Sequence, residues 1–168
     1  MKLKQFRYSD GNLAYLIWSG NEAAAIDGGA DEDILAYAHD NSLKLKYVLN
    51  THMHGDHTPG NKALLEASSA EFIGPGELCQ MKSFNLGPEI VEVFPTPGHT
   101  KDSICFSFDG CLLSGDTLFN GTVGNCYTRD YETYFSSLTR LLEFPPETRI
   151  FAGHDLVDYA LGVAEKID

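Results

Sequence analysis

The sequence predicts a layered α/β (α+β) domain built on a mixed sheet or on two sheets. Two observations favour this class. Strand-like runs and helical periodicities interleave along all 168 residues. The first strand-like runs are joined by a short turn, which is typical of an antiparallel hairpin and argues against a purely parallel sheet. The length predicts one domain over residues 1–168, enough to bury a core without disulfides.

The first half of the chain is expected to contain a hairpin, a further buried strand and two helices. Ser19-Gly20-Asn21 is a turn signal between the hairpin strands. Acidic residues at positions 31–33 suit the first turn of a helix, because the helix dipole favours negative charge there. Thr58 and Pro59 match an N-cap and a first helical position. The expected elements are strands at residues 13–18, 23–27 and 47–51, and helices at residues 31–39 and 59–67.

The second half is expected to be richer in strands. Asp130 matches an N-cap, the apolar spacing after it is helical, and Pro145-Pro146 ends that helix. A second helical spacing of apolar residues lies near the end of the chain. The expected elements are strands at residues 71–73, 90–94, 104–108, 111–114 and 149–152, and helices at residues 131–142 and 156–164.

Composition excludes several classes of function. Acidic residues outnumber basic ones by 24 to 12, and the formal net charge is −12. Because nucleic acids and anionic membranes require clustered positive charge, we expect neither as a partner. No signal peptide or membrane-spanning run is visible, and the four cysteines form no C-x-x-C pair. We therefore expect a cytoplasmic protein with reduced thiols. The sequence does not indicate an oligomeric state.

The segment His52-Met53-His54-Gly55-Asp56-His57 carries the strongest chemical signal. Three histidines and one aspartate fall within six residues. Histidine is the commonest metal ligand in proteins. In extended backbone His52 and His54 project to the same side, and Gly55 allows the chain to turn back so that Asp56 and His57 follow. The segment leaves a strand and ends near a helix start, a usual place for a site in α/β folds.

Three more metal-capable residues occur at strand ends beside glycine: His99, Asp116 and His154. Together with the first segment they make five histidines and two aspartates. Seven ligands exceed the three or four that one tetrahedral zinc takes. They suit two metal ions that share a carboxylate, with a water between them.

At these residues the sequence resembles the metallo-β-lactamase superfamily, and within it the glyoxalase II-like (hydroxyacylglutathione hydrolase-like) enzymes, from about Asn12 to Ile167. The resemblance implies the metallo-β-lactamase fold, an αββα sandwich with its site at one edge of the sheets. It also implies that Asp27 supports the ligand loop without touching metal. By the family pattern one ion would be held by His52, His54 and His99, and a second by Asp56, His57 and His154, with Asp116 as the bridge.

The resemblance implies hydrolysis of a thioester or related acyl ester by a metal-bridging hydroxide. Two divalent ions would lower the pKa of a shared water far enough to produce hydroxide at neutral pH. Asp56 would be both a ligand and the catalytic residue that orients this water. We expect zinc, with iron or manganese as compatible alternatives, since imidazole and carboxylate accept all three. No Ser or Cys nucleophile is needed.

The resemblance weakens at the substrate pocket. Asn125 and Tyr127 occupy the positions of a lysine and a tyrosine that bind glutathione in glyoxalase II-type enzymes. Leu156 stands where those enzymes carry another tyrosine, and Arg129 offers a replacement cation. The family's C-terminal helical domain would begin where these 168 residues stop.

Three hypotheses of function follow. The first is a glyoxalase II-like binuclear hydrolase. The second is an oxidoreductase similar to the persulfide dioxygenases of the same superfamily, with one iron held by His52, His99 and Asp116. The third is a non-catalytic metal-binding domain or a fragment of a longer protein.

Overall fold

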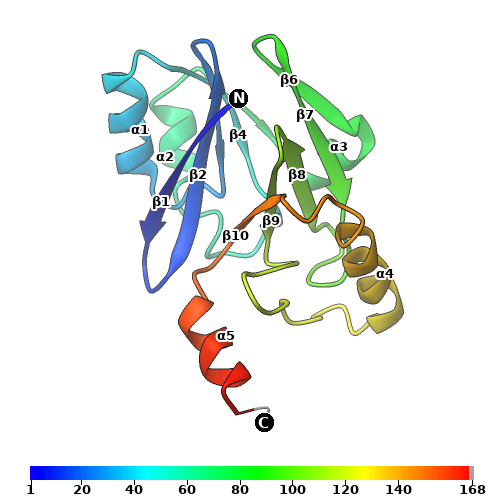
Figure 1. The fold of residues 1–168 in the computed structure, drawn as a ribbon. Helices are drawn as coiled ribbons and strands as arrows, with labels where there is room; N and C mark the ends of the chain where they lie inside the picture. Colours follow the sequence, from blue (N-terminus) through cyan, green and yellow to red (C-terminus); the bar gives the residue numbers. More distant parts are fainter. Residues whose placement is uncertain (167–168) are drawn as a thin grey trace.

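The computed structural model describes residues 1–166. These residues form two facing sheets with helices outside them (Figure 1). The last two residues of the expected domain, including Ile167 at the end of the family resemblance, lie outside the described residues. The first sheet has the order β1-β2-β3-β4-β5 and the second has the order β10-β9-β8-β7-β6. Both sheets mix parallel and antiparallel pairs, as the hairpin signal predicted.

The strands of the first sheet come from the first half of the chain. They are β1 (Lys2–Tyr8), β2 (Asn12–Ser19), β3 (Glu22–Ile26), β4 (Lys44–Leu49) and β5 (Glu71–Ile73). The second sheet contains β6 (Ser83–Leu86), β7 (Glu89–Pro95), β8 (Ile104–Phe108), β9 (Cys111–Gly115) and β10 (Arg149–Ala152). The helices are α1 (Asp31–Asp40), α2 (Asn61–Glu66), α3 (Pro75–Met81), α4 (Tyr131–Leu141) and α5 (Val157–Ala164).

Three apolar layers hold the sandwich together. The largest lies between the sheets and includes Tyr15, Leu49 and Phe106, all nearly or fully buried. A second layer packs α1 and α2 on the outer face of the first sheet, and a third packs α4 on the outer face of the second. This arrangement is the αββα sandwich that the family resemblance implies. Figure 1 shows α1 and α2 beside the first sheet, α4 beside the second, and α5 extending away below. No described helix combines the length and the apolar character that a membrane crossing requires.

One predicted helix start is wrong. The helix expected from Pro59 begins at Asn61, with Gly60 as its N-cap. The Thr58 hydroxyl donates back to the carbonyl oxygens of His54 and Gly55 (both 3.4 Å) and accepts no helical N–H. Thr58 therefore closes the turn that carries the histidine segment. By contrast, Asp130 caps α4 as predicted, because its carboxylate accepts from the Thr133 N–H at 3.0 Å.

Three elements were not predicted: β1, α3 and β6. In β1 only Phe6 is buried, so the strand is mostly polar and lacks the apolar alternation of a half-buried strand. In α3, Gly74-Pro75-Gly76 has the composition of a turn, although Pro75 in fact occupies the start of the helix.

Candidate metal centre

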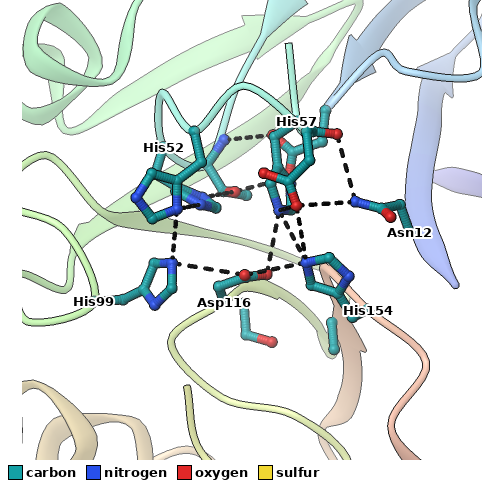
Figure 2. A network of polar contacts seen from close by, with 12 residues as sticks. Asn12, His52, His57, His99, Asp116 and His154 are labelled. Carbon is teal, nitrogen blue, oxygen red and sulfur yellow. Dashed lines mark hydrogen bonds and ion pairs between the residues drawn. The ribbon is translucent and has the colours of Figure 1, made fainter. Parts of the chain in front are cut away.

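Five chain segments meet at the carboxyl ends of the strands, at one edge of the sandwich. Asp27 directly follows β3, and the segment 52–57 follows β4. His99, Asp116 and His154 follow β7, β9 and β10. Figure 2 shows His52, His57, His99, Asp116 and His154 directed toward one another. The structure therefore brings together all seven residues predicted as ligands, from both sheets.

The first group of donors consists of His52, His54 and His99. The Nδ1 atom of His54 lies 3.1 Å from the Nε2 atom of His52 and 3.1 Å from the Nε2 atom of His99. His52 and His99 are buried, whereas His54 is half-buried. The second ring nitrogens of His99 and His52 already have partners. Nδ1 of His99 faces the carbonyl oxygen of Asn125 at 2.9 Å, and Nδ1 of His52 faces the Thr51 hydroxyl at 3.1 Å. These contacts leave both Nε2 atoms for a metal.

The second group consists of Asp56, His57 and His154. The Nε2 atoms of His57 and His154 are 3.3 Å apart, and Oδ2 of Asp56 lies 3.5 Å from Nε2 of His154. His57 is fully buried, while the Asp56 side chain is 53% exposed. Asp56 therefore stands at the rim of the cluster, within reach of water.

Asp116 lies between the two groups. Its Oδ2 atom is 3.6 Å from Nε2 of His99 and 3.2 Å from Nε2 of His154. Its Oδ1 atom is 3.4 Å from Nε2 of His57, and it is buried without a hydrogen-bond partner among the described residues. A buried carboxylate oxygen without a hydrogen bond is costly unless a cation satisfies it.

Asp27 supports the histidine segment through contacts with Thr51 and His57. Its Oδ1 accepts from the Thr51 N–H at 2.8 Å, and its Oδ2 accepts from the Thr51 hydroxyl at 2.7 Å. Oδ2 also lies 3.1 Å from Nδ1 of His57. Asp27 is buried, at φ +53°, a left-handed conformation that Asp tolerates better than most residues. The contact directs Nε2 of His57 into the cluster.

Burial and neighbouring charge set the protonation of the ligands in opposite directions. Burial, assisted by neighbouring His57, lowers the pKa of His52 to about 4, so that its ring is neutral at pH 7. Burial also lowers the pKa of His57, but Asp27 and Asp116 outweigh it and raise that pKa to about 10. Burial likewise opposes ionisation of Asp116, yet contacts with His154 and His57 hold its pKa far below the ordinary value. The carboxylate is therefore ionised, as a ligand must be.

Glycines make room for this packing. A Cβ atom on Gly153 would overlap Asp116 Oδ1 and lie 2.7 Å from Cε1 of His57. Gly115 has φ +50°, and a Cβ there would overlap the Thr51 hydroxyl. The glycines beside the ligands thus allow the five segments to approach one another.

The donor set fits divalent metal ions. Three sets of donors have atoms within 4.8 Å of one another: His52-His54-His99, His52-His57-Asp116 and Asp56-His57-His154. Imidazole nitrogens and carboxylate oxygens suit zinc, iron and manganese. The lowered pKa values of Asp56 and Asp116 keep two carboxylates of the cluster ionised, and this negative charge favours cations.

Of the predicted substrate-binding residues, Tyr127 and Asn125 lie beside the donor groups and Arg129 does not contact them within residues 1–166. The Tyr127 ring lies beside the first group, with ring centroids 5.5 Å from His54 and 5.2 Å from His99, and it is 63% exposed. Asn125 contributes its carbonyl oxygen to His99 and its side-chain amide to the Tyr127 hydroxyl at 3.4 Å. Arg129 is exposed at φ +59°, and within residues 1–166 its guanidinium forms no hydrogen bond or ion pair with the cluster.

Sequence reasoning missed Asn12 and Tyr8, which contact Asp56. The Asn12 amide donates to Oδ2 of Asp56 at 3.1 Å, and the Tyr8 hydroxyl donates to the Asp56 carbonyl oxygen at 2.6 Å. Both residues lie 44 or more positions away in the chain. The local signal was a polar residue, Asn12, directly before the strand predicted at residues 13–18, and Tyr8 lay outside every predicted element.

Comparison with known proteins identifies the family. The family model described as the metallo-beta-lactamase superfamily matches residues 8–86 and 82–154. A protein named hydroxyacylglutathione hydrolase from Pelagibacter ubique is 32% identical over 92% of this chain and 71% of its own length. One of the same name from Anaeromyxobacter dehalogenans is 34% identical over 89% of this chain and 63% of its own length. The chain thus spans roughly two thirds of these relatives.

Solved structures show the same fold. ETHE1 from Myxococcus xanthus superposes with a TM-score of 0.80 at 28% identity, covering 92% of this chain and 76% of that one. The protein TTHA1623, solved in a di-iron-bound form, superposes with a TM-score of 0.74 at 28% identity, covering 90% and 92%. The family model, the relatives and the fold agree, and the chain belongs to the metallo-beta-lactamase superfamily.

Proposed function

We propose that this protein is a binuclear metal-dependent hydrolase of a thioester or related acyl ester. His52, His54 and His99 would hold one ion, and Asp56, His57 and His154 the other. The observation that carries the proposal is the position of Asp116, whose two carboxylate oxygens face histidines of both groups. The relatives named hydroxyacylglutathione hydrolase support the thioester as the substrate class.

Bound divalent ions would supply a water acidified enough to be hydroxide near neutral pH. The chain's own residues supply position and charge. Asp56 is 53% exposed, so its carboxylate can accept a hydrogen bond from water at the rim, whereas His52, His57, His99 and Asp116 are buried. Asp116 is only 9% exposed and lies too deep for that task. Asp56 is therefore the proposed catalytic residue.

Residues 125–129 are the proposed contacts for the thiol carrier. Tyr127 stands beside the first donor group with an exposed ring, which suits contact with a substrate. Asn125, at the position of the family's lysine, offers an amide in place of a cation. Arg129 would have to supply positive charge for an anionic carrier such as glutathione. We also propose that the protein acts in the cytoplasm on a small molecule.

A mononuclear-iron oxidoreductase is the second candidate. It is supported by two short distances: 4.8 Å between the ring centroids of His52 and His99, and 3.6 Å from His99 Nε2 to Asp116 Oδ2. Iron also occurs in a related structure, the di-iron form of TTHA1623. The four remaining donors, His54, Asp56, His57 and His154, are then without a role, which is why the hydrolase is preferred.

One experiment separates these hypotheses. Native protein is analysed for metal and then assayed with S-lactoylglutathione, simple thioesters, a lactone and glutathione persulfide. Two ions per chain with thioester or lactone turnover support the hydrolase. One iron per chain with oxygen uptake on the persulfide supports the oxidoreductase. Metal binding without turnover of any substrate favours the non-catalytic domain and contradicts both enzymes.

A further inference from the structure

Asn12 lies where the two sheets meet at the metal centre. It opens β2 of the first sheet, and its backbone forms an isolated antiparallel bridge with His154, which follows β10 of the second. Hydrogen bonds flank this bridge on both sides. The Leu13 N–H donates to the Gly153 carbonyl oxygen at 2.9 Å, and the Asp155 N–H donates to the Gly11 carbonyl oxygen at 2.9 Å.

The side chain of Asn12 contacts Asp56. Its amide nitrogen donates to Oδ2 of Asp56 at 3.1 Å and reaches the Asp56 carbonyl oxygen at 3.5 Å. Figure 2 shows the amide entering the cluster from the first sheet. Asn12 is only 7% exposed, whereas the Asp56 side chain is 53% exposed. A buried, fixed donor thus holds a carboxylate that could otherwise turn into solvent.

We propose that Asn12 is a positioning residue that sets Asp56 against His154 and thereby tunes the affinity of the ion these two residues share with His57. The inference rests on the proposed two-ion centre. The main-chain bridge of Asn12 fixes the loop of His154, and the Asn12 amide fixes the carboxylate of Asp56. One residue therefore connects candidate ligands from both sheets. The amide NH₂ group donates and does not coordinate metal, so it orients Asp56 without competing for the ion.

The test is Asn12→Leu, which removes the donor at similar size and leaves the backbone bridge in place. Cobalt(II) is titrated into metal-free protein and the two dissociation constants are read from the absorption spectrum. We expect the constant of one ion to rise about 10- to 100-fold, the usual effect of losing such a hydrogen bond to a ligand. The ion affected should be the one that Asp56→Ala weakens. Asn85→Leu, the same change on the exposed side of β6, should alter neither constant.

A double-mutant cycle separates positioning from packing. If Asn12 acts through Asp56, Asn12→Leu has no further effect on metal affinity in the Asp56→Ala background. A loss that persists in that background, or unchanged constants in Asn12→Leu, would overturn the inference. Asn12→Ala is the second variant if Asn12→Leu fails to fold, and it should give the smaller loss because water can replace the amide. If the wild-type chain binds two ions, the proposed two-ion centre stands whatever the Asn12 variants show. If it binds only one ion, both the two-ion centre and the inference about Asn12 are overturned.

Discussion

Asp27 Oδ2 lies 3.1 Å from Nδ1 of His57, and both side chains are buried. The same carboxylate receives the N–H and the hydroxyl of Thr51. One aspartate at the end of β3 therefore fixes the start and the end of the histidine segment. With Nδ1 of His57 turned toward Asp27, Nε2 is the ring nitrogen that faces the other donors.

Asp27→Asn tests this support. Asparagine tolerates φ +53° and keeps the shape, but it removes a buried charge from His57 and turns one acceptor into a donor. We expect the free energy of unfolding of the metal-free protein to fall by about 3 kcal/mol, as when one partner of a buried pair is lost. Urea denaturation measures it. Asp40→Asn, at an exposed position 77% accessible, is the control, and equal losses in the two variants would contradict the role.

Gly153→Ala tests whether close packing shapes the centre. The added Cβ would overlap Asp116 Oδ1 and crowd His57, although no donor atom is removed. We expect metal affinity to fall at least about tenfold, because displacing a ligand costs about as much affinity as removing a residue that orients it. A chelator competition measures this. In the matched change Gly162→Ala in α5, the added Cβ meets no atom of residues 1–166 within 4 Å and should leave affinity unchanged. If both variants bind metal like the wild type, the crowding argument fails.

Tyr134, which is not itself a candidate ligand, gives a pH-dependent prediction. Its hydroxyl donates to the carbonyl oxygens of Thr117 (2.8 Å) and Gly124 (2.9 Å), and burial raises its pKa to about 12. Between about pH 10 and 12 the unfolded chain has lost the tyrosine proton while the folded chain retains it. Stability should therefore fall as pH rises through this window.

Tyr134→Phe removes both the hydrogen bonds and the titration. At pH 8 it should be about 1 kcal/mol less stable than the wild type. At pH 11 the difference should shrink, because only the wild type loses the stability linked to Tyr134. Urea denaturation at the two pH values gives the comparison. A difference that stays constant or widens would show that Tyr134 does not titrate as argued.

The candidate ligands could be predicted because their signals are local. His52 and His54 stand two apart after a strand, and glycines neighbour Asp116 and His154. Few residue types bind metal, so a cluster of them is conspicuous in a sequence. The buried hairpin strands and the Asp130 cap were likewise encoded within a few neighbouring residues.

The supporting contacts could not be predicted because they join distant segments. Asn12 is 44 residues from Asp56, and nothing near it in the chain marks it as a partner of a ligand. The strand β1 was missed for a similar reason: it is an edge strand stabilised by pairing with β2, while its own side chains are mostly polar. Thr58 had the right residue type for a cap, but its hydroxyl bonds to His54 and Gly55.

Arg129→Ala tests whether this acidic protein recognises an anionic thiol carrier. Arg129 is exposed on the loop that carries Tyr127, and an exposed ion pair contributes up to about 1 kcal/mol. We therefore expect KM for S-lactoylglutathione to rise about two- to fivefold at low salt, with kcat unchanged. The KM for an uncharged thioester should not change, and added salt should narrow the difference between wild type and variant. Lys62→Ala, a cation 84% exposed on α2, serves as control. If KM for S-lactoylglutathione is the same in Arg129→Ala as in the wild type, Arg129 is not part of the binding site and a carrier without negative charge is favoured.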